Sequence, residues 1–208
     1  MRWRRGTVRC VDALEDALRV ISSMNEAGVD YVVVGGVAMN LHGLVRATED
    51  LDLFIRPEPE NVERLRQALR AVWSDPSIDE ITAEDLCGDY PAVRYGPPEG
   101  TLYLDILTRL GQATVFNDLE VEERAVEGVV VRVATPRTLY RMKRHTVLLR
   151  LKIFAAREDF RRSRTASGAS GGRGGTERPI AAEGRARRPI DHADAAALRA
   201  AFELDDED

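Results

Sequence analysis

Residues 31–55, YVVVGGVAMNLHGLVRATEDLDLFI, decide the fold because they predict two apolar strands joined through a glycine-containing turn. The run at 31–34 is rich in β-branched residues, which is typical of a buried strand. Gly35 and Gly36 follow, and their missing side chains permit a tight turn and the close approach of a ligand. Residues 37–39 then predict the first turn of a short helix. The free backbone N–H groups of such a turn suit a phosphate group.

The second strand of this stretch carries two carboxylates on one face. Because strand side chains alternate between faces, Asp50 and Asp52 lie together, while Leu51 and Leu53 point the other way. Neighbouring carboxylates repel each other unless a cation lies between them, and Mg²⁺ is a hard cation that prefers oxygen ligands. A phosphate-binding turn followed closely by a carboxylate pair therefore predicts a site for a metal–nucleotide complex.

These motifs resemble the nucleotidyltransferases of the DNA polymerase β superfamily, and most of all the minimal AbiEii-like branch of toxin–antitoxin and abortive-infection systems. The matching residues, in the order G-G-x-A, H-G, R-x-T-x-D-x-D, are Gly35, Gly36, Ala38, His42, Gly43, Arg46, Thr48, Asp50 and Asp52. The resemblance implies an α/β fold of polymerase β type, with a small mixed sheet flanked by helices and with C-terminal helices. It also implies transfer of a nucleoside monophosphate from an NTP to an acceptor hydroxyl, with two Mg²⁺ ions.

A third carboxylate interrupts an otherwise apolar strand predicted at 101–107. An isolated buried charge is costly, so Asp105 needs either an ion-pair partner or a metal. The resemblance places a third catalytic carboxylate on a neighbouring strand, and Asp105 matches that position. A structural, ion-paired aspartate is the alternative. Asp118 is a weaker candidate because residues 116–118 read as a turn.

A helix predicted at 137–151 carries one of the only two lysines of the chain, Lys143. Thr135 is a suitable N-cap, and Pro136 suits the first helical position. Where arginine is so plentiful, a retained lysine suggests a compact point charge. The segment TPRTLYRMKR also resembles the Lys-bearing helix of the family, whose lysine faces the nucleotide phosphates. A solvated basic helix is the alternative.

The motifs and the resemblance together define a candidate site. We expect the catalytic residues to be Asp50, Asp52, Asp105 and Lys143, with the three aspartates also serving as metal ligands. We expect nucleotide contacts from Gly35, Gly36, Arg46 and Thr48. His42 is expected to support the loop before Arg46 rather than to bind a ligand.

Apolar periodicity predicts the remaining elements. We expect helices at 11–27, 60–73 and 189–202, and strands at 92–95, 121–125 and 129–133. Residues 74–89 are acidic and weakly patterned, so we expect a loop with one short helix there.

A change of composition divides the chain into three parts. We expect a nucleotidyltransferase domain at 1–155, a disordered basic insertion rich in Gly, Ser and Arg at 156–188, and a C-terminal helix with an acidic tail at 189–208 that completes the domain. In the resembling family, the M-K-R-x-T-V and R-P-x-D-x-x-D segments lie almost next to each other. About forty residues separate them here, which leaves open whether Asp191 and Asp194 dock beside Lys143.

The overall composition fits a globular protein without a membrane span. The chain has 208 residues, 44% of them hydrophobic, and a net charge of −5, which argues against general coating of nucleic acid. No apolar stretch is long enough to cross a bilayer. The basic residues at 1–5 are not followed by an apolar core, so we expect no signal peptide. Cys10 and Cys87 lack metal-ligand spacing and read as reduced thiols, so we expect a cytoplasmic protein.

Two other functions share features with this sequence. A phosphatase with an aspartyl nucleophile also uses Asp-x-Asp, but it needs the motif at the end of an apolar strand near the N-terminus. Here the mostly polar residues 46–49 precede the motif, which disfavours this function. A nucleotide- or RNA-binding or antitoxin-like module could retain the fold without turnover. For the transferase, the expected partners are an NTP, an acceptor that is either an RNA or tRNA end or a protein, and a cognate antitoxin or toxin.

Overall fold

The structure is a computed structural model that describes residues 5–48, 50–88, 91–98, 102–110, 114–145 and 189–205. Within these ranges, the side chains of residues 5–13 and 189–191 are not described. The insertion expected at 156–188 therefore lies outside the described residues, as does the end of the helix expected at 137–151.

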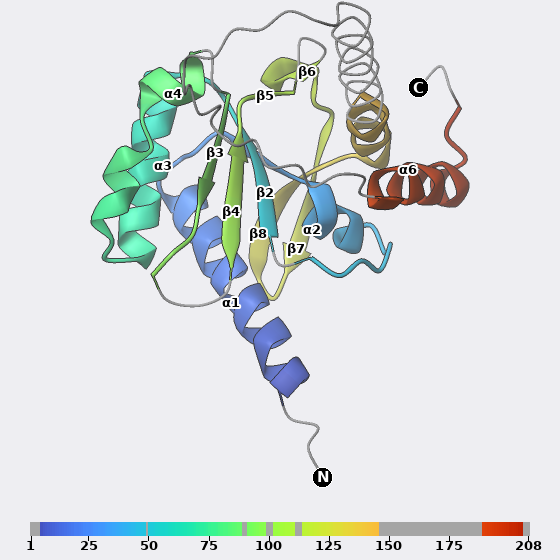
Figure 1. The fold of residues 1–208 in the computed structure, drawn as a ribbon, viewed down its shortest axis with the longest axis horizontal. Helices are drawn as coiled ribbons and strands as arrows, with labels where there is room; N and C mark the ends of the chain where they lie inside the picture. The colour runs from blue at the N-terminus through green and yellow to red at the C-terminus, as the bar shows by residue number, and fades with distance from the viewer. Residues whose placement is uncertain are drawn as a thin grey trace, which may run out of the picture.

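The main sheet has six strands in the order β3-β4-β2-β1-β8-β7 (Figure 1). The strands are β1 (Tyr31–Val34), β2 (Asp50–Ile55), β3 (Ala92–Tyr95), β4 (Tyr103–Leu107), β7 (Val121–Val126) and β8 (Val129–Ala134). The β2–β4 and β1–β8 pairs are parallel and the other pairs are antiparallel. This mixed sheet confirms the predicted α/β class.

Helices cover the sheet and occupy its ends. They are α1 (Arg5–Glu26), α2 (Gly35–Leu41), α3 (Pro59–Val72), α4 (Ala83–Cys87), a helix at residues 136–145, and α6 (Pro189–Phe202). Helices α1 and α3 pack against each other, and α6 lies beside α2 in Figure 1. Helix α1 begins earlier than the predicted residue 11, and α6 has the predicted bounds. None of the described helices combines the length and apolar character that a bilayer span requires.

The core forms where the central strands meet α1. All four residues of β1 are buried, because β1 lies between β2 and β8 and is covered on both faces. Helix α1 contributes a buried stripe at three- and four-residue steps that includes Ala17, Ile21 and Met24. This burial fixes the ends of β1 and β2, and these ends carry the glycines and the carboxylates.

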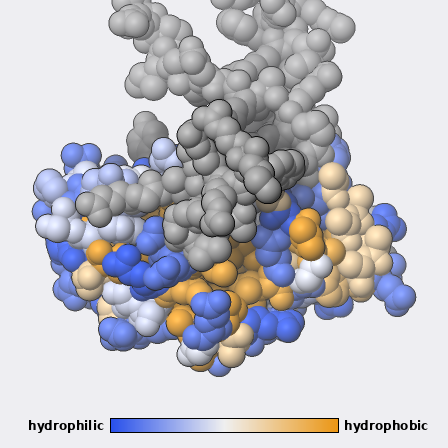
Figure 2. All heavy atoms as spheres, turned by 90° about the horizontal axis from the view of Figure 1, so that it is seen from below, coloured by the Kyte–Doolittle hydropathy of each residue, from blue (hydrophilic) through white to orange (hydrophobic). Residues whose placement is uncertain are grey.

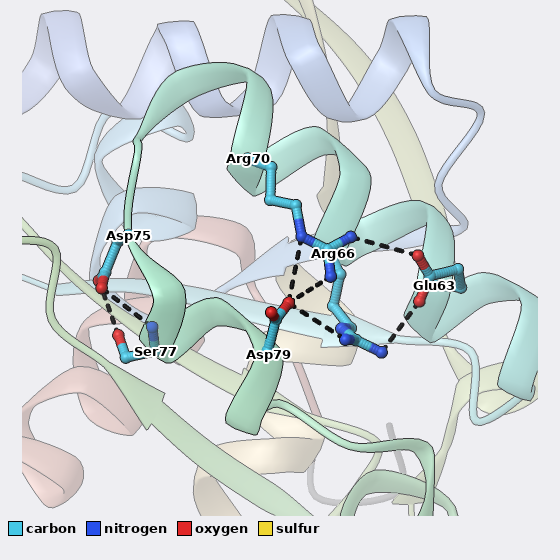
Figure 3. A network of polar contacts seen from close by, with 6 residues as sticks. All are labelled: Glu63, Arg66, Arg70, Asp75, Ser77 and Asp79. Carbon is cyan, nitrogen blue, oxygen red and sulfur yellow. Dashed lines mark hydrogen bonds and ion pairs between the residues drawn. The ribbon is translucent and has the colours of Figure 1, made fainter.

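Residues 74–88 contain two short helices, whereas one was expected in the segment 74–89. Asp75 accepts a hydrogen bond from Ser77 N (3.0 Å) and caps the 3₁₀ helix η1 (Pro76–Glu80), and Thr82 caps α4 through Asp85 N (3.1 Å). Figure 3 shows Arg66 and Arg70 of α3 between Glu63 and Asp79, so ion pairs attach η1 to α3. Each of these helices has only five residues, which is too short to show the apolar periodicity on which the prediction relied.

A small second sheet was not predicted either. It consists of β5 (Arg109–Leu110) and β6 (Thr114–Val115) and leads into the 3₁₀ helix η2 (Phe116–Asp118), where a turn was expected. Strands of two residues are too short to show alternation in the sequence.

The surface mixes polar and apolar side chains. Seen from below, hydrophobic residues gather toward the middle of the visible face and hydrophilic residues lie around them (Figure 2). Such a mixture is ordinary for a globular chain.

Candidate active site

Three carboxylates meet on one face of the sheet, where β1 ends and β2 and β4 begin. In the parallel β2–β4 pair, Asp52 lies opposite Asp105, and Asp50 lies two residues along the same face of β2. Leu51 and Leu53 point into the core from the opposite face and are fully buried. The structure therefore brings together the three aspartates that the sequence singled out.

The first turn of α2 closes directly on Asp52. Gly35 has φ +65°, and a Cβ atom there would lie 1.9 Å from Asp52 Oδ2, so only glycine fits. Gly36 N–H donates to Asp52 Oδ2 at 3.4 Å. The helix thus begins at Gly35, two residues earlier than expected, and one of the predicted free N–H groups is bound to a carboxylate. Phosphate binding by Gly35 and Gly36 stays a prediction.

Burial and repulsion act together on the central carboxylate. The pKa of Asp52 is raised to about 6, first because burial disfavours its charged form and then because Asp105 is negative. The Gly36 N–H and the positive charge of Lys143 lower this pKa, but less strongly. Asp52 therefore lies at a point of excess negative charge that a cation would relieve.

The donor set fits a hard divalent cation. All three side chains are carboxylates from adjacent strands, and oxygen ligands are what Mg²⁺ prefers. Within the described ranges, no three His, Cys, Asp or Glu side chains are already close enough together to form a metal cluster. Metal binding by these aspartates stays a prediction.

Cationic side chains lie beside this carboxylate face and share an aspartate of α6. Asp194 Oδ2 lies 3.1 Å from Lys143 Nζ and 3.4 Å from Arg46 Nη1, and the Asp194 side chain is only 8% exposed. Helix α6 therefore does dock beside Lys143, which the sequence had left open. The side chain of Asp191 lies outside the described part of the chain.

The loop between α2 and β2 is held by hydrogen bonds of its own. Asn40 Nδ2 donates to Arg46 O (2.8 Å), and Arg46 N donates to Asn40 Oδ1 (2.7 Å). Thr48 Oγ1 donates to Asp50 O (3.1 Å), so this hydroxyl is engaged with the strand backbone. A Cβ on Gly36 would lie 2.8 Å from Thr48 Cβ, so the loop packs closely on α2.

His42 attaches the end of α2 to the far side of the sheet. Its Nε2 lies 2.8 Å from Ala134 O, its Nδ1 lies 3.2 Å from Glu122 Oε1, and its ring meets Phe202 of α6 edge-on. The side chain is 1% exposed. These contacts join His42 to β8, β7 and α6, and its expected support of the loop before Arg46 stays a prediction.

Comparison with known proteins identifies the family. The model of the family described as "Nucleotidyl transferase AbiEii toxin, Type IV TA system" matches residues 17–167, which is more than half of the chain. The chain belongs to the AbiEii family. No curated protein sequence matches it significantly. Family membership supports nucleotidyl transfer within a toxin system.

Two solved structures are similar to this chain at low sequence identity. A candidate nucleotidyltransferase of Thermotoga maritima is 13% identical with a TM-score of 0.48, and the match covers 73% of this chain and 93% of the other. The second, ANT(2")-Ia in complex with adenylyl-2"-tobramycin, is 14% identical with a TM-score of 0.41, and the match covers 91% and 99%.

Two residues of the candidate site were missed from the sequence. Arg94 of β3 donates to Asp50 Oδ1 (2.6 Å) and lies 3.5 Å from Asp105 Oδ2, and Asn40 holds the loop as described above. A faint signal existed for Arg94, since alternation in AVRY places it on one face of a strand. Only the register of β3 against β4 shows that this face carries Asp105.

The weaker carboxylate candidate has another role in this AbiEii chain. Asp118 Oδ2 accepts a hydrogen bond from Val115 N (3.0 Å) and so caps η2. This local contact explains its place in the turn.

Proposed function

We propose that this AbiEii protein transfers a nucleoside monophosphate from an NTP to an acceptor hydroxyl and releases pyrophosphate. The observation that carries the proposal is the register of β2 and β4, which gathers Asp50, Asp52 and Asp105 on one face in an AbiEii chain. In the reaction, the acceptor oxygen forms a bond to the α-phosphorus of the NTP. The bond between the α-phosphorus and the oxygen that bridges the α- and β-phosphates breaks, and pyrophosphate leaves. We assign the hydroxyl proton to Asp105.

We assign Asp50, Asp52 and Asp105 as the residues that would hold Mg²⁺. Two bound ions would offset the triphosphate charge and lower the pKa of the acceptor hydroxyl. The contribution of the chain itself is to fix these carboxylates. The β2–β4 pairing holds their backbone positions, and the Gly36 N–H holds the Asp52 side chain.

The cationic side of the site would receive the triphosphate. Lys143 and Arg46 both lie beside the carboxylate of Asp194, and these three side chains together carry a net positive charge. Each of the two cations is 15% exposed at its side chain, and Asp194 restricts where they can point. We therefore infer that α6 orients Lys143 and Arg46 toward the phosphates, and that residues 189–205 complete the same domain.

The acceptor is proposed as an RNA, including a tRNA end, or a protein, and a cognate antitoxin is inferred from the family description. The test is incubation of the protein with each α-³²P-labelled NTP, Mg²⁺, total RNA and total cell protein, followed by nuclease or protease digestion of the labelled product. Asp52→Asn is the inactive control. Binding of Mg–NTP without label transfer to any acceptor would contradict the proposal and indicate a binding module.

A further inference from the structure

Arg94 occupies the exposed side of the carboxylate face. It lies opposite Asp105 in the antiparallel β3–β4 pair, and β4 pairs in turn with β2, which carries Asp50. Its Nη2 donates to Asp50 Oδ1 at 2.6 Å, and its Nη1 lies 3.5 Å from Asp105 Oδ2. One guanidinium therefore bridges two of the three assigned metal ligands.

Arg94 and a metal would compete for the same two carboxylates. A divalent cation bound to Asp50 and Asp105 would lie beside the positive guanidinium, and like charges at that distance repel. The guanidinium also lies against one oxygen of each carboxylate, Asp50 Oδ1 and Asp105 Oδ2. Arg94 in its present position therefore opposes metal binding at this pair.

The bridge is also weak enough to be broken. The Arg94 side chain is 46% exposed, and those of Asp50 and Asp105 are 20% and 29% exposed. Ion pairs as exposed as these contribute little to stability. The guanidinium also lies 4.7 Å from the centre of the Tyr103 ring, which is itself exposed and offers a surface on which the arginine can stay after release.

We propose that Arg94 is a displaceable counter-ion of the metal site. It pairs with Asp50 and Asp105 in the metal-free protein and leaves them when divalent cations enter. The inference rests on the proposed function, because it assumes that these aspartates bind metal. Its consequence is that metal affinity is lower than the carboxylates alone would give.

The first test compares Mn²⁺ binding in wild type, Arg94→Gln and Arg56→Gln, using the electron paramagnetic resonance signal of free Mn²⁺. Arg56 is a matched control at the other end of β2: it pairs with Asp30 at 3.2 Å and lies 4.5 Å from the centre of the Phe116 ring. Arg94→Gln should bind Mn²⁺ about three- to tenfold more tightly, since the ion pairs with Arg94 no longer have to break. Arg56→Gln should match wild type.

The second test observes the displacement itself. The Nε–H resonance of Arg94, assigned by its absence in Arg94→Gln, should move on saturation with Mg²⁺ toward the position of a solvated arginine. An unmoved resonance with Mg²⁺ bound, or unchanged Mn²⁺ affinity in Arg94→Gln, would overturn the inference and leave the proposed function intact. If wild type binds neither Mn²⁺ nor Mg–NTP, the metal site of the proposed function fails and this inference fails with it.

Discussion

At the scale of single residues, Asp52 combines a buried position with two negative neighbours. Its pKa rises from 3.8 to about 6, so in the metal-free protein the folded state holds a proton more tightly than the unfolded chain between these values. The folded state binds more protons there, and the free energy of unfolding falls as the pH rises through this window. The stability that comes from the protonated Asp52 carboxyl is present in full below pH 3.8 and is lost above about pH 6.

Asp52→Asn should therefore stabilise the metal-free protein at pH 7.5 while abolishing transfer. At ~1.36 kcal/mol per pH unit, a rise from 3.8 to about 6 sets an upper limit of about 3 kcal/mol. The measurement is urea unfolding in EDTA at pH 4.5 and 7.5 for wild type and variant. The difference between the two proteins should shrink toward pH 4.5. Equal stability at both pH values would contradict the assignment of the charge to Asp52.

Asp105→Asn separates a catalytic role from a structural one. If Asp105 is the third carboxylate, the transfer rate should fall about 100-fold or more, whereas Mg–NTP binding should weaken far less. The measurements are single-turnover rates and nucleotide titrations. Asp118→Asn is the matched control, because its amide oxygen can still cap η2. A normal rate with lowered thermal stability in Asp105→Asn would indicate a structural aspartate that pairs with Arg94.

At the scale of elements, the start of α2 depends on two features of Gly35: its positive φ and its close approach to Asp52. Gly43, just after the end of α2, has the first feature without the second and so separates them. Gly35 and Gly43 both have positive φ, +65° and +84°, but only at Gly35 would a Cβ atom collide with Asp52. Gly43→Ala should lower the free energy of unfolding by about 1–2 kcal/mol through backbone strain and keep activity. Gly35→Ala should cost more and abolish transfer, because Asp52 must move. Urea unfolding and transfer assays measure both effects, and equal activity of the two variants would contradict this reading.

Elements whose pattern is complete within one segment were predictable. Alternation in residues 50–55 alone places Asp50 and Asp52 on one face, and the β-branched run before Gly35 identifies β1. The register of β2 against β4 is not contained in either segment. The prediction that Asp105 lies on a strand next to β2 came from the resemblance to the family, because the local pattern does not indicate which strands pair.

Contacts that depend on register or on reciprocal side-chain bonds were not predictable. Arg94 lies opposite Asp105 only because β3 pairs antiparallel with β4 in this register. Asn40 matters because its amide matches both backbone groups of Arg46, and no periodicity reveals such a match. The short strands β5 and β6 likewise form through pairing, not through propensity.

At the scale of the whole molecule, a helix from the far end of the described chain docks beside the candidate site. Helix α6 supplies Asp194 to Lys143 and Arg46, and its Phe202 ring packs edge-on against His42 at the end of α2. Leu198 of the same helix is fully buried. The docking thus combines an apolar contact with a charged one.

Removing the charged contact should release α6 from the rest of the fold. Asp194→Ala leaves the two cations without the carboxylate that they share, and breaking a buried ion pair in this way costs about 3–5 kcal/mol. His192→Ala, at an exposed position on the same helix, is the control and should change little. Hydrogen–deuterium exchange should show faster exchange in residues 189–205 of Asp194→Ala only, with a lower urea midpoint and reduced transfer. If both variants exchange alike, α6 is held by its apolar contacts alone, and Asp194 does not position Lys143.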